Sequence, residues 1–209
     1  MKNNVNYSLY LVTDRDVLVD LDIFAAVEEA IKGGVTLVQL REKRLSTLEF
    51  YNIAVKIKII TDKYKIPLII NDRIDIAQAI DAAGVHIGQS DMPATIARSI
   101  IGDNKILGVS TATLKEAQRA EKQGADYVGV GAMFPTTTKD DASAVSVLSL
   151  KEIKEKISIP VVAIGGINEK NVNLLKIANI DGIAVVSDIL GKKSVRSSAE
   201  KLCSSIKQK

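Results

Sequence analysis

Short apolar runs alternate with amphipathic segments along the whole chain. Eight of the runs are typical of strands buried in a parallel sheet, because each is short, nearly continuous and followed by polar or small residues. The expected strands are Ser8–Thr13, Leu37–Arg41, Pro67–Asn71, Val85–Gly88, Ile106–Ser110, Tyr127–Gly131, Val161–Ile164 and Gly182–Val186. Between them, segments such as 24–31 and 53–60 repeat apolar residues every three or four positions, which predicts helices with one buried face.

Eight strands that alternate with helices predict an α/β fold closed into a (β/α)8 TIM barrel. An open doubly wound sheet is the alternative, but the first strand-to-helix turn lacks the Gly-x-Gly-x-x-Gly that a dinucleotide site needs. No low-complexity linker or charge block divides the chain, so we expect residues 1–209 to form one barrel domain. The longest irregular stretch, Ala132 to Ser149, follows the sixth strand, and loops of this length are usually functional.

The composition excludes several classes of protein. Hydrophobic residues make up 46% and charged residues 25% of the chain, which is ordinary for a globular domain. The net charge of +3 is evenly spread, which argues against a nucleic-acid partner. No apolar run approaches membrane-spanning length and no signal-peptide pattern is present, so we expect a soluble, cytoplasmic protein without a membrane partner. The single Cys203 fits a reducing compartment, and we expect it to be a small buried residue of the last helix.

In a barrel, the residues that follow each strand meet at one mouth. Gln39, Arg41 and Lys43 occupy alternating positions where the second strand ends. An arginine and a lysine on one face suit a phosphate, which the guanidinium contacts through two parallel hydrogen bonds and the ammonium as a point charge. Salt bridges on the surface are the alternative.

Carboxylates follow the third and fourth strands. Asn71 and Asp72 end the third strand, and Asp91 follows the fourth. Two aspartates from adjacent strand ends favour Mg²⁺, which binds one or two carboxylates and completes its shell with water and phosphate oxygens. Alone, Asp72 could also be a general base or the N-cap of a helix that begins near Arg73. The lone His86 lies within a strand, where we expect a packed or hydrogen-bonded side chain, and one histidine disfavours zinc.

The remaining strand ends carry hydroxyls, glycines and one lysine. Ser110 ends the fifth strand, and Thr136, Thr138 and Lys139 follow the sixth, in a loop that suits oxyanions or is merely polar and flexible. Glycines after the seventh strand and Ser187 after the eighth match the phosphate site of such barrels, where backbone amides bind the anion. The mouth therefore predicts a metal-free phosphate near strands seven and eight. A metal-bound pyrophosphate is expected near Arg41, Lys43, Asp72, Asp91 and Lys139.

Ordered blocks at these strand ends make the chain resemble the thiamine-phosphate synthase family. The blocks are Tyr10–Asp14, Val38–Lys43, Asn71–Arg73, Gly84–Asp91, Gly108–Ser110, Gly129–Gly131, Phe134–Thr136, Thr138–Lys139, Val162–Gly166 and Ala184–Ser187. The resemblance covers nearly the whole chain. It implies a barrel that condenses hydroxymethylpyrimidine pyrophosphate with hydroxyethylthiazole phosphate, releases pyrophosphate and requires Mg²⁺. Two phosphorylated heterocycles are thus the expected partners, and a homo-oligomer stays open.

The resemblance also implies roles for individual residues. Contacts to the pyrimidine pyrophosphate fall to Gln39, Arg41, Lys43, Asn71, Ser110 and Lys139. The magnesium ligands would be Asp72 and Asp91. Contacts to the thiazole phosphate fall to Thr136, Thr138, Gly166, Val186 and Ser187. The family is thought to lose pyrophosphate first and to capture the resulting cation with the thiazole nitrogen, which assigns catalytic roles to Arg41, Lys43, Ser110 and Lys139.

Three rival functions remain at this point. A thiazole tautomerase would share the barrel and the thiazole-phosphate pocket without needing the paired aspartates. A phosphosugar epimerase of the ribulose-phosphate type normally needs several histidines, and a non-catalytic phosphometabolite-binding barrel stays open. One departure from the synthase pattern is the sequence Gly-Ala-Met-Phe at 131–134, where the family has a Gly-Pro-Ile-Phe type of sequence.

Overall fold

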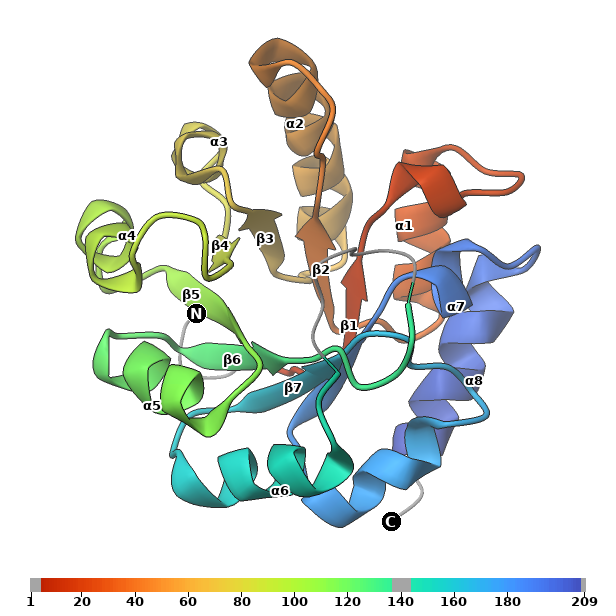
Figure 1. Cartoon of the computed structure of the whole chain (residues 1–209). Helices are drawn as coiled ribbons and strands as arrows, with labels where there is room; N and C mark the ends of the chain where they lie inside the picture. Colours follow the sequence, from red (N-terminus) through yellow and green to blue (C-terminus); the bar gives the residue numbers. More distant parts are fainter. Residues whose placement is uncertain (1–4, 137–143, 208–209) are drawn as a thin grey trace.

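The eight predicted strands form a closed parallel barrel in the computed structural model of the chain, which describes residues 5–136 and 144–207 (Figure 1). The strands are β1 (Leu9–Val12), β2 (Leu37–Leu40), β3 (Leu68–Asn71), β4 (Gly84–Ile87), β5 (Ile106–Thr111), β6 (Tyr127–Val130), β7 (Val161–Ile164) and β8 (Gly182–Val185). Every strand lies within one residue of its predicted bounds. Each strand pairs with the next, and β8 returns to β1 through the pair Leu9 and Ile183, so the (β/α)8 prediction is confirmed.

Helices surround the barrel and connect successive strands (Figure 1). They are η2 (Arg15–Val17), α1 (Ile23–Lys32), α2 (Thr47–Lys63), α3 (Ile74–Ala79), α4 (Ala94–Ile101), α5 (Leu114–Lys122), α6 (Val147–Lys156), η3 (Val172–Ala178), α7 (Ser187–Leu190) and α8 (Val195–Lys207). Local sequence fixes several of their starts. Asp22 caps α1 by accepting from the Ala25 N–H at 2.9 Å, and Ser46 and Glu49 form a reciprocal capping box at α2.

Two apolar layers hold the barrel together. The larger layer fills the space between the strands and the surrounding helices. The smaller layer fills the barrel interior and includes Tyr10, Leu37, Ile69 and Tyr127. Because side chains alternate between the two faces of a strand, Gln39 lies on the same interior face as Leu37, one step nearer the mouth. The interior layer therefore lies directly beneath the polar residues at the strand ends.

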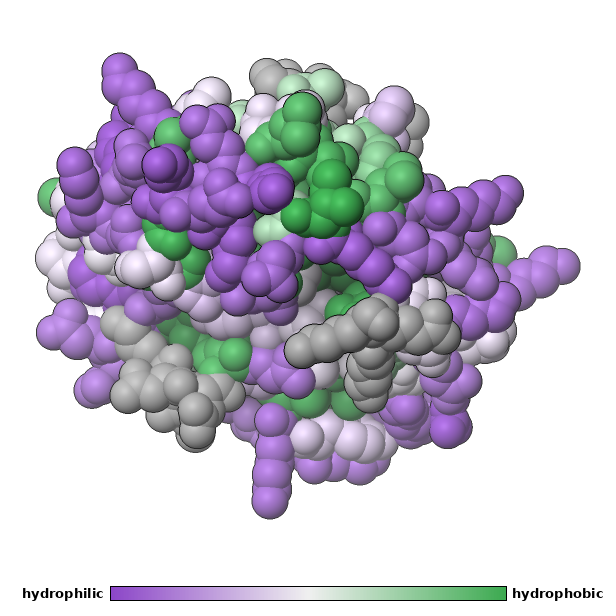
Figure 2. All heavy atoms as spheres, turned by 90° about the horizontal axis from the view of Figure 1, so that it is seen from below, coloured by the Kyte–Doolittle hydropathy of each residue, from purple (hydrophilic) through white to green (hydrophobic). Residues whose placement is uncertain are grey.

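The outer surface is mostly polar. Figure 2, seen from below, shows charged and polar side chains over most of that face, with apolar side chains gathered among them. On the packed pair α6 and η3, Leu148, Leu174 and Ile177 are exposed. Cys203 lies in α8 as predicted, but it is only partly buried, beside Gly34. Within the described ranges, no helix combines the length and apolar character needed to cross a bilayer.

Candidate active site

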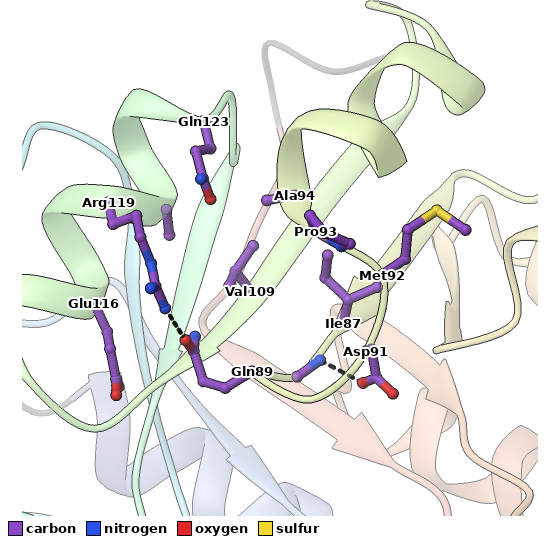
Figure 3. A pocket seen from close by; sticks show the side chains of 12 residues that line it. Ile87, Gln89, Asp91, Met92, Pro93, Ala94, Val109, Glu116, Arg119 and Gln123 are labelled. Carbon is purple, nitrogen blue, oxygen red and sulfur yellow. Dashed lines mark hydrogen bonds between the residues drawn. The ribbon is translucent and has the colours of Figure 1, made fainter.

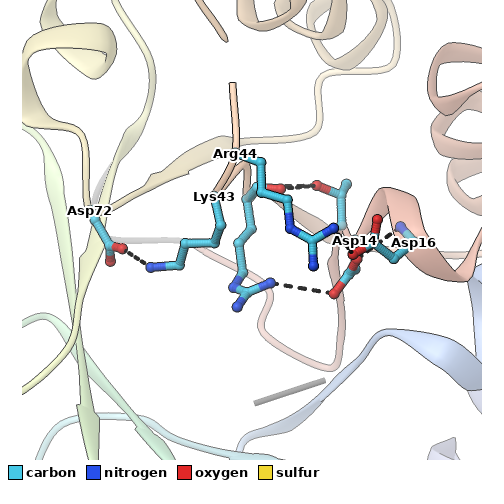
Figure 4. A network of polar contacts seen from close by, with 7 residues as sticks. Asp14, Asp16, Lys43, Arg44 and Asp72 are labelled. Carbon is cyan, nitrogen blue, oxygen red and sulfur yellow. Dashed lines mark hydrogen bonds and ion pairs between the residues drawn. The ribbon is translucent and has the colours of Figure 1, made fainter. Parts of the chain in front are cut away.

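Asp72 lies at the barrel mouth directly after β3, with its backbone in the left-handed region at φ 58°. Its carboxylate accepts hydrogen bonds from the Lys43 ammonium and, at 2.7 Å, from the Asn71 amide. Figure 4 shows the Lys43 side chain extending from the end of β2 toward Asp72. Helix α3 begins at Ile74 without any side-chain cap. The helix-cap alternative for Asp72 is therefore wrong.

Asp91 places a second carboxyl group against Asp72. One Asp91 oxygen, Oδ2, accepts from the Gly88 backbone N–H at 2.7 Å in the loop after β4. Burial raises the pKa of Asp72, the hydrogen bond and charge of Asp91 raise it further, and Lys43 opposes both. Asp72 and Asp91 are therefore neighbouring carboxyl groups whose mutual repulsion a cation would relieve.

The donor set fits Mg²⁺ better than zinc. Within the described part of the chain, His, Cys, Asp and Glu side chains nowhere gather in a group of three or more that could hold a metal by themselves. A cation at Asp72 and Asp91 would therefore take two carboxylates and fill its shell with water and substrate oxygens, as Mg²⁺ does. Lys43 already occupies one Asp72 oxygen, so the ion pair and a metal would compete for it.

The loops after β1 and β2 are tied together by ion pairs (Figure 4). The Arg41 guanidinium lies 3.4 Å from Asp14 Oδ2, and Arg44 lies 3.3 Å from Asp16 on the exposed outer side. The Arg41 backbone N–H also donates to Thr13 Oγ1 at 3.0 Å. Asp14 was not predicted as part of the site, although it ends the first block of the family resemblance. It holds Arg41 at the mouth beside the Lys43 and Asp72 pair.

Gln39 and Ser110 are joined by a chain of hydrogen bonds through the barrel interior. Gln39 Nε2 donates to Tyr10 Oη at 2.8 Å, and Tyr10 Oη lies 2.8 Å from Tyr127 Oη. Tyr127 Oη lies 2.9 Å from His86 Nδ1, and His86 Nε2 lies 2.9 Å from Ser110 Oγ. The prediction that His86 is a hydrogen-bonded strand residue is thus confirmed. The two tyrosines were missed, and the period-two pattern of β1 and β6 is the signal that places them inside the barrel.

The loops after β6 and β7 pack directly on each other. The Phe134 N–H donates to the Gly165 carbonyl at 3.0 Å, which continues the pairing of these two strands into the mouth. Gly166 has φ +62°, and a Cβ there would lie 2.5 Å from the Pro135 carbonyl oxygen. The structure therefore brings Thr136, the residue after Pro135, into the neighbourhood of Gly166. Of the other predicted residues of this loop, Thr138 and Lys139 lie outside the described residues.

Val186 and Ser187 lie at the next strand end. Val186 occupies the N-cap position of α7, and Ser187 is the first residue of that short helix. The Asp188 carboxylate accepts from the Glu169 N–H at 2.9 Å, which fastens the loop after β7 to α7. The predicted phosphate residues after β7 and β8 are therefore on one connected rim.

A cavity of about 190 Å³ lies outside the barrel, between α4 and α5 (Figure 3). The Gln89 and Arg119 side chains point toward each other across it and form a hydrogen bond. Among the predicted site residues that the structure describes, only Asp91 lines this cavity. The cavity thus adjoins the mouth of the barrel at the loop after β4.

The fold and its strand ends define a (β/α)8 barrel enzyme with polar and charged side chains converging at the mouth. The sequence model described as thiamine monophosphate synthase matches residues 9–189. The thiamine-phosphate synthase of Clostridium tetani is 61% identical over 199 residues, which cover 95% of each chain. That of Alkaliphilus oremlandii is 60% identical over 209 residues, covering 99% of this chain and 100% of the relative.

A solved structure agrees with the sequence comparisons. The thiamine phosphate pyrophosphorylase from Pyrococcus furiosus superposes with a TM-score of 0.91 at 40% identity, covering 98% of this chain and 97% of that one. The chain belongs to the thiamine monophosphate synthase family. It is therefore a transferase of thiamine biosynthesis that acts on small molecules.

Proposed function

We propose that the protein is a magnesium-dependent thiamine-phosphate synthase. It joins 4-amino-2-methyl-5-hydroxymethylpyrimidine pyrophosphate to 4-methyl-5-(2-phosphoethyl)thiazole and releases pyrophosphate. The observation that carries the proposal is the pairing of Asp72 with Asp91 beside Lys43 at the mouth, in a chain of this family. A reaction on the thiazole phosphate alone would have no use for a carboxylate pair suited to a metal-bound pyrophosphate.

The cationic side chains act on the leaving group. The bond between the pyrimidine methylene carbon and the pyrophosphate oxygen breaks, and its electron pair departs with pyrophosphate. Arg41 and Lys43, together with Lys139, stabilise the negative charge that grows on that oxygen. The Asp14 carboxylate keeps the Arg41 guanidinium at the rim until a phosphate replaces it.

The thiazole nitrogen then supplies the lone pair that forms the new carbon–nitrogen bond. This step needs no side-chain base, only close placement of the nitrogen against the cationic carbon. Thr136, Thr138, Gly166, Val186 and Ser187 bind the thiazole phosphate and provide that placement. The connected rim formed by the loops after β6, β7 and β8 supports this assignment.

Asp72 and Asp91 are the residues that would hold Mg²⁺. When bound, the ion neutralises charge on the pyrophosphate oxygens. Asn71 donates to Asp72 and orients its carboxylate, and Lys43, which pairs with Asp72, would be free to contact the pyrophosphate when that carboxylate holds the ion. Gln39 and Ser110 face the pyrimidine end of the same substrate.

The test is a pyrophosphate-release assay with both heterocycles, with and without Mg²⁺. We expect release only when both substrates and the metal are present, and none after chelation by EDTA. Lys139→Ala and Asp72→Ala should each reduce turnover at least about 100-fold, because each removes charge that the leaving group needs. Near-normal turnover in both variants would refute the assigned roles.

The same assay separates the rival functions. A thiazole tautomerase would convert its thiazole phosphate without pyrimidine substrate, metal or pyrophosphate release. A non-catalytic binding barrel would bind the thiazole phosphate in calorimetry and convert neither substrate. Either result would overturn the synthase proposal.

A further inference from the structure

The hydrogen-bond chain from Gln39 to Ser110 crosses the buried interior of the barrel. Its middle members, Tyr10 and Tyr127, are about 1% exposed or less, and they lie 117 residues apart in sequence. Burial raises the pKa of both hydroxyls, so both stay protonated and can donate. The chain ends at Gln39 and Ser110, which face the mouth.

Two glycines make room for this chain. A Cβ at Gly108 would lie 2.2 Å from the Tyr127 ring and 2.4 Å from His86 Nδ1. A Cβ at Gly129 would lie 3.2 Å from His86 Cε1. Strands β5 and β6 thus lack side chains at the interior positions where Tyr127 and His86 cross.

The hydrogen bonds have a direction. Gln39 Nε2 donates to Tyr10 Oη, so the Tyr10 hydroxyl keeps its own hydrogen for Tyr127. Tyr127 then donates to His86 Nδ1, which makes His86 Nε2 the protonated ring nitrogen and the donor to Ser110. With Gln39 Nε2 facing Tyr10, the opposite direction would leave the Tyr10 hydrogen without an acceptor among these groups. With this polarity, Gln39 Oε1 and the Ser110 hydroxyl hydrogen are the groups that the described hydrogen-bond chain leaves for a ligand.

We propose that Tyr10, Tyr127 and His86 are positioning residues that fix Gln39 as an acceptor and Ser110 as a donor at the mouth. An aminopyrimidine carries an exocyclic N–H donor and ring-nitrogen acceptors, so it complements this pair of groups. The part of the proposal that concerns this substrate rests on the proposed function. The direction of the hydrogen bonds is independent of the proposed function.

The polarity can be measured without turnover, because His86 is the single histidine of the chain. In untagged, ¹⁵N-labelled protein, long-range ¹H–¹⁵N correlation gives the imidazole pattern of His86 alone. We expect a protonated Nε2 and an unprotonated Nδ1. A dominant Nδ1–H tautomer would overturn the proposed direction.

Tyr127→Phe breaks the chain while keeping the ring. The matched control is Tyr7→Phe, because Tyr7 is an interior tyrosine whose ring centroid lies 4.9 Å from that of Tyr127 but whose hydroxyl is outside the chain. We expect Tyr127→Phe to shift the His86 nitrogen signals and Tyr7→Phe to leave them in place. Tyr10→Phe breaks the adjacent link and serves as the second variant.

Enzyme kinetics test whether the hydrogen-bond chain affects substrate binding through its end residues, Gln39 and Ser110. Tyr127→Phe should raise the KM for the pyrimidine pyrophosphate about tenfold, the effect of one misplaced hydrogen-bonding group, and leave the KM for the thiazole phosphate unchanged. In a Ser110→Ala background the same change should raise this KM by a smaller factor than in wild type, since one of the two groups that it positions is already gone. Equal effects of Tyr127→Phe and Tyr7→Phe would refute the positioning role.

The two proposals fail in different ways. If wild-type protein releases no pyrophosphate, the proposed function fails, and calorimetry with the pyrimidine pyrophosphate replaces KM as the readout. Unchanged affinity in Tyr127→Phe would then overturn positioning. Release that works in wild type together with an Nδ1–H tautomer would overturn the polarity alone.

Discussion

Lys43 and Asp72 form an ion pair across the ends of β2 and β3, although the two residues have different proposed ligands. Lys43 is assigned to the pyrophosphate, and Asp72 to the metal. In the ion pair, each side chain compensates the charge that the ligand of the other would meet. The pair therefore keeps the carboxylate compensated and must open when metal and substrate bind.

This competition predicts that Lys43→Met binds Mg²⁺ more tightly in the absence of substrates. Lys43 is half-exposed, so solvent screens the ion pair and limits the gain to about three- to fivefold. Turnover should fall at least about 100-fold, because leaving-group stabilisation is lost. Calorimetry with Mg²⁺ and the pyrophosphate-release assay measure the two effects.

Arg44→Met is the control for the loss of a nearby cation. Arg44 pairs with Asp16 on the exposed side of the same loop, away from Asp72 (Figure 4). We expect its Mg²⁺ affinity and turnover to stay within about twofold of wild type. Weaker Mg²⁺ binding in Lys43→Met than in Arg44→Met would contradict the competition.

The metal site itself is tested by Asp72→Asn and Asp91→Asn. Each change keeps the size of the side chain and removes one anionic ligand, so the Mg²⁺ concentration for half-maximal turnover should rise at least about tenfold. Asp81→Asn is a matched control, because Asp81 is also an aspartate in the left-handed region, at φ 52°, but is exposed and pairs with Lys105. Loss of Mg²⁺ response in Asp81→Asn would show that the effect is general and not local.

The pH dependence of Mg²⁺ binding follows from the environment of Asp72. Burial, and then Asp91, raise the pKa of Asp72, and a bound proton excludes the metal. Affinity should therefore be full when Asp72 is ionised and should fall on acidification, starting at a higher pH than for an ordinary aspartate. Lys43 lowers this pKa, so Lys43→Met should move the loss to still higher pH. Calorimetric Mg²⁺ titrations over a pH series check both shifts, and an unshifted Lys43→Met profile would contradict them.

The thiazole-phosphate rim is tested by Gly166→Ala. Gly166 has positive φ, and an added Cβ would meet the backbone carbonyls of Pro135 and Phe134 at 2.5 and 2.7 Å, so the loops after β6 and β7 must separate. We expect the KM for the thiazole phosphate to rise at least about tenfold and the melting temperature to fall. Both are measured on the purified variant.

Gly102→Ala isolates backbone strain from this clash. Gly102 also has positive φ, at 73°, but nothing lies within 4 Å of its added Cβ. It should lose some stability, about 1 kcal/mol, and keep its KM for both substrates. If both glycine variants raised KM equally, the rim would not be the cause.

The barrel and its strand bounds could be predicted because each strand is a short buried run, and that signal is local. The same local reasoning placed Asp72 and Asp91 on neighbouring strand ends. It could not decide whether Asp72 caps α3, because a cap and a free carboxylate look alike in sequence. The left-handed backbone of Asp72 and its bond to Lys43 decide this.

Contacts inside the barrel were out of reach for a different reason. Alternation puts Tyr10 and Tyr127 on interior faces, but whether their hydroxyls meet depends on the register of all the strands between them. The roles of Gln39 and Ser110 stay predictions, as do those of Thr138 and Lys139, which lie outside the described ranges. The sequence therefore predicts the strand ends, whereas the links between them come from the structure.

An ion pair at the end of the barrel opposite the mouth allows stability to be tested separately from function. Arg98 of α4 donates to the Gly124 carbonyl at 2.9 Å and to the Asp126 carboxylate at 2.5 Å, and both charged side chains are mostly buried. Arg98→Ala removes the ion pair from a mostly buried carboxylate that still accepts from the Leu107 N–H. We expect a loss of about 2–4 kcal/mol in the free energy of unfolding, measured by urea denaturation.

Substrate kinetics should not change in Arg98→Ala. The residues at the mouth keep their positions as long as the strands stay paired. Arg98→Ala should keep KM for both substrates, whereas the mouth variants should change KM, metal response or turnover. Arg196→Ala is the matched control, since Arg196 pairs with Glu200 on the exposed face of α8 and should lose no more than about 0.5 kcal/mol. Equal stability of the two arginine variants would mean that the buried pair adds nothing beyond a surface ion pair. A raised KM in Arg98→Ala would instead show that the two ends of the barrel are coupled.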